Sequence, residues 1–243
     1  PRALGEAPER AGLFLDLALH ARRLGHPYWG ARFLAWSLHY LQDVSQPYHA
    51  VQLPSPELIY RRPGSGPDVD VTTRLVAYYH FAFELLASRL VAGDDEAGRA
   101  LQKALSQDPA APAGSAAAAH DAESISLSAS GRRRSRDAAE LTREQARAAA
   151  RRSPAAGKAS LSLFPEVSDP ESLDPSRKLA DPSWWAELHK RRSEEAAAFE
   201  GYLGVVAESL GDAGAAWRAL LLGALEHHSR SDGETVTISP HGR

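Results

Sequence analysis

Two histidine–carboxylate spacings in apolar, helix-patterned sequence constrain this chain more than any other feature. His39 and Asp43 lie four residues apart, so both side chains occupy the same face of a helix. His80 and Glu84 repeat this spacing inside Val71–Leu90, which is otherwise largely apolar or aromatic. Burying a carboxylate without a partner carries a large desolvation penalty, so the two apolar faces predict a bound cation.

A third imidazole follows the first pair closely. Pro47 ends the helix, because the residue before a proline is pushed out of the α region, and His49 comes on the turn just outside. Imidazole and carboxylate ligands without thiolate favour zinc, with manganese, iron or nickel as alternatives. The sequence therefore predicts a metal site whose candidate ligands are His39, Asp43, His49, His80 and Glu84.

These residues resemble a known family, the bacterial zinc-dependent phospholipases C and their relatives, the single-strand-specific zinc nucleases. The stretch from His39 to His49 is similar to the family pattern His-Tyr-x-Gly/Thr-Asp-apolar-x-x-Pro-x-His and departs from it only at Gln42. His80 and Glu84 match a later family pair, which ends in Glu in the phospholipases and in Asp in the nucleases. The resemblance implies an all-α helical bundle and favours the phospholipase branch.

The resemblance also implies a chemistry. The family holds up to three zinc ions in one cleft, and this chain would hold one or two of them. His39 would bind one member of a close metal pair, and Asp43 would bridge that pair as the catalytic carboxylate, while His49, His80 and Glu84 would hold the third ion. The expected activity is hydrolysis of a phosphoric ester in a phospholipid, or alternatively in nucleic acid or a nucleotide. A secreted or periplasmic location and no stable protein partner are expected as well.

The remaining family ligands lie before the first helix of this chain: a terminal Trp, two further His and an Asp. The residues before Pro8 supply none of them, and His20 and His26 are expected to be helix-surface and turn residues. Three interpretations therefore stay open. The chain is an N-terminally truncated hydrolase, a degenerate non-catalytic zinc-binding bundle, or a metal-free helical interaction protein.

Composition narrows the class of protein. The 243 residues suffice for one or two domains, and the net charge of −3 argues against a general nucleic-acid or membrane-surface electrostatic footprint. The absence of Cys excludes disulfides and thiolate metal sites. No long apolar run occurs, so the sequence predicts no transmembrane segment.

Hydrophobic periodicity predicts helices separated by turns, with a proline-rich surface loop at Val51–Pro67. The metal-binding helices would fill residues 1–106, helices at 181–228 would complete the bundle, and residues 229–243 would be a frayed tail. The predicted helices are Pro8–Leu24, Tyr28–Val44, one from just after Pro67 to about Ala92, Asp95–Leu105, one from about Pro182 to Gly211, and Ala213–His228.

Residues 107–180 differ in character, because Ala, Ser, Pro and Arg dominate and Phe164 is their only aromatic residue. Such a composition drives little burial, so the sequence predicts a long disordered insertion. Within it, Asp137 and Glu140 are spaced as a capping box that would open a polar helix to about Arg152, without an apolar stripe.

Overall fold

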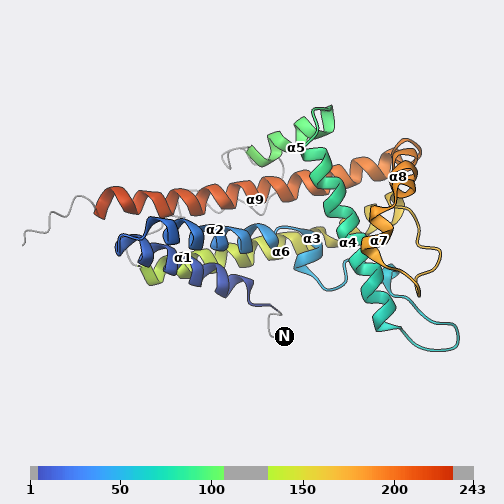
Figure 1. Ribbon diagram of the computed structural model, residues 1–243, viewed down its shortest axis with the longest axis horizontal. Coiled ribbons are helices and arrows are strands. Elements are labelled where there is room, and N and C mark those ends of the chain that lie inside the picture. The colour runs from blue at the N-terminus through green and yellow to red at the C-terminus, as the bar shows by residue number, and fades with distance from the viewer. Residues whose placement is uncertain (1–4, 107–130, 232–243) are drawn as a thin grey trace, which may run out of the picture. The chain divides into compact units, whose positions relative to one another are not determined.

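The computed structural model describes residues 5–106 and 131–231 and is all-α, as predicted (Figure 1). Of these residues 79% are helical and none forms a strand. In the described ranges no single helix is long and apolar enough to span a membrane, although α4 and α5 together, bent by 94°, pass that test. The elements are α1 (Ala7–Arg23), α2 (Pro27–Asp43), α3 (Pro47–Ala50), the 3-10 turn η1 (Pro56–Leu58), α4 (Val69–Val91), α5 (Glu96–Ser106), α6 (Gly131–Leu163), α7 (Pro175–Ala180), α8 (Pro182–Glu194) and α9 (Ala196–Ser231).

The chain divides into two compact units. Unit 1 comprises Pro1–Leu41, Pro109–Thr142 and Ala216–Arg243, and unit 2 comprises Gln42–Asp108 and Arg143–Ala215. Because these bounds fall inside α2, α6 and α9, each of the three helices contributes residues to both units.

Unit 1 has an aliphatic core. Ser37 on α2 donates a buried hydrogen bond to the carbonyl oxygen of Ala11 on α1, at 2.7 Å, which fixes these two helices against each other. Gly25, with φ +77°, makes the turn between them in a conformation that glycine adopts without strain. The buried core residues are Leu15, Ala18, Leu19, Leu34, Leu38, Leu41, Ala138, Ala216, Leu220 and Ala224.

Unit 2 has an aromatic core built around α4. The Tyr78 hydroxyl donates to the carbonyl oxygen of Pro165 at 2.6 Å and accepts a hydrogen bond from Trp184 Nε1 at 2.7 Å. Tyr202 on α9 donates to the carbonyl oxygen of Phe83 at 2.7 Å. Since all of these rings are buried and their polar atoms are satisfied, α4 is held firmly along its length.

The prediction that residues 107–180 are disordered is wrong for residues 131–180, which include α6 and α7. In unit 2 the buried face of α6 consists mainly of small side chains, among them Ala149, Ser153, Ala156 and Ser160, until Leu163 at its end. These bury little area each but let neighbouring backbone approach closely, a signal that a search for large apolar residues misses. The helix begins at Gly131, so Asp137 lies inside it rather than capping it. Residues 107–130 lie outside the described part of the chain.

The predicted division of the last two helices at Gly211 is also wrong. The helix break falls at Glu195, between α8 and α9, and α9 continues through Gly211 and Gly214. Tyr202, Val206 and other residues of α9 are buried, and this burial outweighs the low helix propensity of glycine. Of the predicted frayed tail, residues 229–231 belong to α9, and the rest lies outside the described residues.

Candidate metal centre

Helix α4 presents His80 and Glu84 one turn apart, as the spacing predicts. The helix starts at the N-cap Asp68, whose carboxylate accepts the backbone N–H of Val71 at 3.0 Å. His80 Nε2 lies 3.2 Å from Glu84 Oε1. The two side chains are 21% and 42% exposed, so they stand at the surface of unit 2, reachable by an ion from solvent.

His49 comes from α3, a single-turn helix where a turn was expected. Gln46 is its N-cap, and the Gln46 side-chain oxygen accepts the backbone N–H of Tyr48. Pro47 fills the first helical position, where its missing N–H costs nothing. Ser153 on α6 donates to the carbonyl oxygen of Pro47 at 2.8 Å, so the small-residue face of α6 supports the helix that carries His49.

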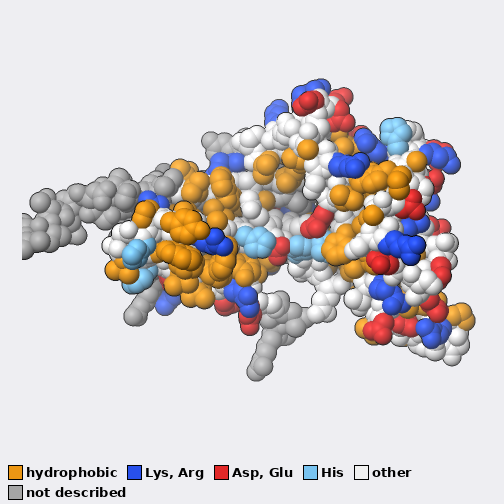
Figure 2. Space-filling model, in the orientation of Figure 1, with side chains coloured by type: hydrophobic (Ala, Val, Ile, Leu, Met, Phe, Trp, Pro, Cys, Tyr) orange, Lys and Arg blue, Asp and Glu red, His pale blue; other side chains and the backbone are white. Residues whose placement is uncertain are grey.

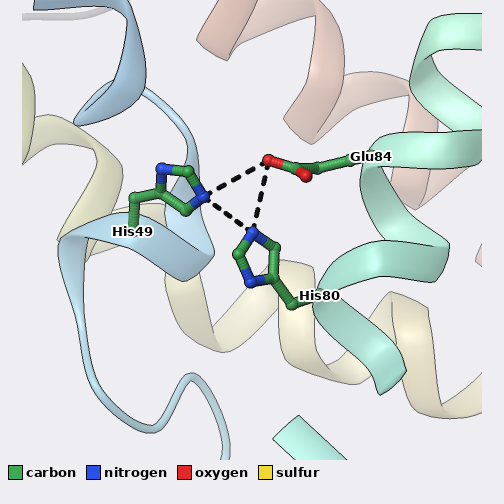
Figure 3. Close-up of side chains that lie close together, drawn as sticks. All are labelled: His49, His80 and Glu84. Carbon is green, nitrogen blue, oxygen red and sulfur yellow. Dashed lines mark hydrogen bonds and ion pairs between the residues drawn. The ribbon is translucent and has the colours of Figure 1, made fainter. Parts of the chain in front are cut away.

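Helices α3 and α4 bring His49, His80 and Glu84 together (Figure 3). His49 Nε2 lies 2.7 Å from His80 Nε2 and 3.3 Å from Glu84 Oε1. Among the described residues, this is the cluster of three metal-ligating side chains whose ligand atoms all lie within 4.8 Å of one another. The structure thus brings one residue of the His39–His49 stretch, His49, together with both residues of the His80–Glu84 pair.

The separations suit a small cation. Zinc lies about 2.0–2.1 Å from His and carboxylate ligands, which sets ligand atoms of a tetrahedral site about 3.3 Å apart. The two histidine–glutamate distances, 3.3 and 3.2 Å, agree with that value. The distance of 2.7 Å between the two Nε2 atoms is shorter and is that of a hydrogen bond, in which the N–H of one ring donates to the bare nitrogen of the other.

Asp43 and Gln46 hold the ligands from outside the cluster. Asp43 Oδ1 lies 2.6 Å from His49 Nδ1, so His49 donates its outer N–H to a carboxylate, the arrangement that orients metal-binding histidines. The Gln46 amide donates to Glu84 Oε1 at 3.3 Å. Sequence reasoning missed Gln46, although its position before Pro47, where a helix N-cap falls, was a usable signal.

Electrostatics keep this cluster charged. Hydrogen bonds with Asp43 and then with Glu84 raise the pKa of His49 to about 9, against its ordinary 6.5. Hydrogen bonds from His49 and then from His80 hold the pKa of Glu84 far below its ordinary value, so this carboxylate stays ionised at neutral pH. A proton on His49 must therefore leave before a cation can take its place.

An aromatic ring backs the cluster. The Tyr48 ring is buried and stacks on the His80 imidazole, with ring centroids 5.7 Å apart and planes 6° apart. Burial raises the pKa of Tyr48, so its hydroxyl stays neutral. The stacking limits the orientations open to His80.

The other candidate ligands lie outside the cluster. Asp43 contacts it through His49, so the structure assigns it an orienting contact, and its predicted bridging of a metal pair stays a prediction. His39 belongs to unit 1, where it is exposed on α2 with its ring 5.6 Å from that of Tyr40. His20 and His26 are exposed in unit 1, in agreement with their expected surface and turn positions.

Comparisons with protein-family models, with curated proteins and with solved structures find no match for this chain. The assignment of the cluster therefore depends on the geometry above and on the motif residues themselves.

Proposed function

We propose that this protein is a zinc-dependent hydrolase of phosphoric esters, similar to the phospholipases C, with the ion bound by His49, His80 and Glu84. The observation that carries the proposal is the convergence of these three ligand atoms on one point. The match of His39–His49 to the family motif supports the choice of reaction.

The ligand count favours catalysis over a structural role. Structural zinc sites in proteins use four protein ligands, whereas catalytic sites use three, two His and one Glu in some hydrolases, and keep one position for water or substrate. Here three side chains converge, and the exposed fractions of 24% for His49 and 42% for Glu84 leave a side of the cluster accessible. A purely structural zinc-stabilised bundle is the weaker alternative.

Each side chain has a defined part in this proposal. A zinc ion supplies a Lewis acid that lowers the pKa of water and offsets phosphate charge. His49 and His80 would hold it as neutral imidazoles, and Glu84 would add one negative charge. Asp43 would fix the tautomer of His49 by accepting its Nδ1–H, and Gln46 would fix the rotamer of Glu84.

The test is hydrolysis of phosphatidylcholine, single-stranded DNA and a chromogenic phosphodiester, with zinc added. We expect turnover that chelation abolishes. His49→Ala should lower this activity by at least about 100-fold, since removing a residue that only hydrogen-bonds to a metal ligand already costs about 10–100-fold in activity. His189→Ala, an exposed histidine on α8, is the matched control and should retain full activity.

The substrate that turns over also decides between the phospholipase and nuclease branches. Tight zinc binding without turnover on all three substrates would contradict the hydrolase and favour the structural site. Turnover that persists in His49→Ala would exclude this cluster as the catalytic centre.

A further inference from the structure

The α1–α2 hairpin in unit 1 carries an apolar surface that the proposed chemistry does not use. Figure 2 shows hydrophobic side chains gathered over α1 and α2, interrupted by a few basic ones. The most exposed are Tyr28 at 64%, Leu24 at 60%, Leu13 at 53%, Trp29 at 50% and Trp36 at 45%. Apolar residues exposed singly are ordinary on protein surfaces, but a contiguous group of this kind marks an interaction site.

The aromatic rings on this surface form a continuous row. Tyr28, Trp29 and Phe33 follow one another at centroid distances of 5.4 and 5.8 Å. Phe33 lies 6.3 Å from Trp36, which lies 4.8 Å from Phe14 of α1. We call this surface the α1–α2 patch, and it consists of Leu13, Phe14, Leu24, Tyr28, Trp29, Phe33, Trp36 and Tyr40.

A hollow opens within the patch. Its volume is about 340 Å³, and Leu17, Leu24, Trp29 and Phe33 contribute to its wall together with His20 and His26. The space is of the size that takes a small apolar group or a few methylenes of an acyl chain.

Between Leu13 and Tyr40, the span of the patch, basic side chains outnumber acidic ones by three to one. From Leu17 to Gln42 the sequence contains Arg22, Arg23 and Arg32 and no Asp or Glu, although the whole chain has a net charge of −3. Arg32 donates a hydrogen bond to the Tyr28 hydroxyl at 3.0 Å, so a cation stands among the exposed rings. Asp16 comes just before this stretch and so lies between the patch residues Leu13 and Leu24, and Asp43 directly follows the stretch. The net charge of the whole chain argued against a membrane-surface footprint, but it does not reveal this local excess of positive charge.

We propose that the α1–α2 patch docks on the surface of an anionic phospholipid bilayer. Trp and Tyr are the side chains enriched where apolar and aqueous regions meet in membranes, and arginines beside them attract anionic headgroups. An interface with another protein needs no aromatic residues in particular. The three arginines between Leu13 and Tyr40, against the single carboxylate of Asp16, favour an anionic surface. Docking on a bilayer would bring a lipid-ester hydrolase to its substrate. In this respect the inference rests on the proposed function.

The test is co-sedimentation of the full chain with vesicles, carried out in chelator so that no turnover is needed. One set contains phosphatidylcholine and phosphatidylserine in equal parts, and the other is pure phosphatidylcholine. We expect the wild type to sediment with the anionic vesicles. Leu24→Ser/Trp29→Ser should weaken this binding about tenfold or more, because two half-exposed apolar groups lose their burial in the bilayer interface. Arg23→Gln/Arg32→Gln should weaken it by about fivefold per arginine and remove the preference for the anionic lipid.

The controls separate this inference from the hydrolase. Val69→Ser removes a residue that is 73% exposed in unit 2, and it should bind vesicles as the wild type does. His80→Ala should also bind normally, so a failed metal site leaves this result intact. Equal binding by the wild type and Leu24→Ser/Trp29→Ser would overturn the proposal. So would a wild type that ignores vesicles and instead forms a dimer that the same double variant abolishes, which would assign the patch to a second copy of the chain.

Discussion

The cluster of His49, His80 and Glu84 is held by two supports of opposite kinds. Helix α4, which carries His80 and Glu84, is anchored by large buried rings such as Tyr78 and Phe83. The short helix α3, which carries His49, is supported by the small-residue face of α6 through the Ser153 hydrogen bond to Pro47. One support works by filling space with side chains, and the other works by bringing backbone close to backbone.

The two supports should respond differently to mutation. A support built of large rings fails when a ring is removed, because a cavity remains. A support that depends on close approach of backbones fails when a side chain at the contact is enlarged, because the neighbouring backbone must then shift. Shortening a buried side chain of α4 and lengthening one on α6 should therefore both disturb the cluster, the first by leaving a cavity and the second by overpacking.

The largest effect is expected from Phe83→Ala. Phe83 is 3% exposed, and its ring lies 4.8 Å from that of Tyr202 and 5.6 Å from that of Tyr48. We expect the free energy of unfolding to fall by about 3–5 kcal/mol, measured by denaturant titration. The exposed Val69→Ala should change it by less than about 0.5 kcal/mol. A loss from Phe83→Ala as small as that of the control would mean that rings do not anchor α4.

Asp43→Asn tests the contact that orients His49. The amide oxygen can still accept the Nδ1–H of His49, but it carries no charge, so we expect zinc affinity to fall by about 10–100-fold with the fold retained. Isothermal titration with zinc measures this change. Glu200→Gln, an exposed carboxylate on α9, should leave the affinity unchanged. An unchanged affinity in Asp43→Asn would remove Asp43 from the site.

Gly157→Ala tests the close approach of α6. A Cβ at this position would lie 2.8 Å from the Cβ of Ser55 and 3.2 Å from the carbonyl oxygen of Pro54. We expect overpacking to cost about 1–3 kcal/mol in the free energy of unfolding. Gly204→Ala in α9 meets open space and should instead stabilise by up to about 1 kcal/mol. Thermal melts of the two variants should shift in opposite directions, and a shift of the same sign would show that α6 does not pack as tightly as described.

The smallest expected effect is the pH dependence of stability without metal. The pKa of His49 is raised from 6.5 to about 9 in the folded chain, so its protonated form stabilises the fold. That contribution is fully present below pH 6.5 and is lost as pH rises through about 9. Melting temperatures in chelator should fall across this window, and less so in His49→Ala. The gain in melting temperature from added zinc should grow over the same window, because zinc displaces the His49 proton.

Helix α4 and its ligand pair could be predicted from the sequence because their signals are local. The Asp68 cap, the apolar period and the His80–Glu84 spacing all lie within one helix. The four-residue spacing alone sets the two side chains on one face. By contrast, the approach of His49 to that pair depends on the part of α6 around Ser153, whose buried Ala and Ser residues give little hydrophobic signal.

The role of Asp43 and the break between α8 and α9 could not be predicted for a similar reason. Spacing places Asp43 near a metal site but does not say whether its carboxylate contacts an ion or the Nδ1 of His49. Glycines at 211 and 214 favour a helix end locally, and only the burial of α9 shows that the helix continues. Both outcomes are set by tertiary contacts across many residues.

Binding of one zinc ion by His49, His80 and Glu84 can be tested directly by measuring metal content. Wild type and His80→Ala are purified without added metal and analysed for zinc, manganese, iron and nickel. We expect close to one zinc per wild-type chain and almost none in His80→Ala. No metal in the wild type, or equal zinc in both proteins, would contradict zinc binding by these residues.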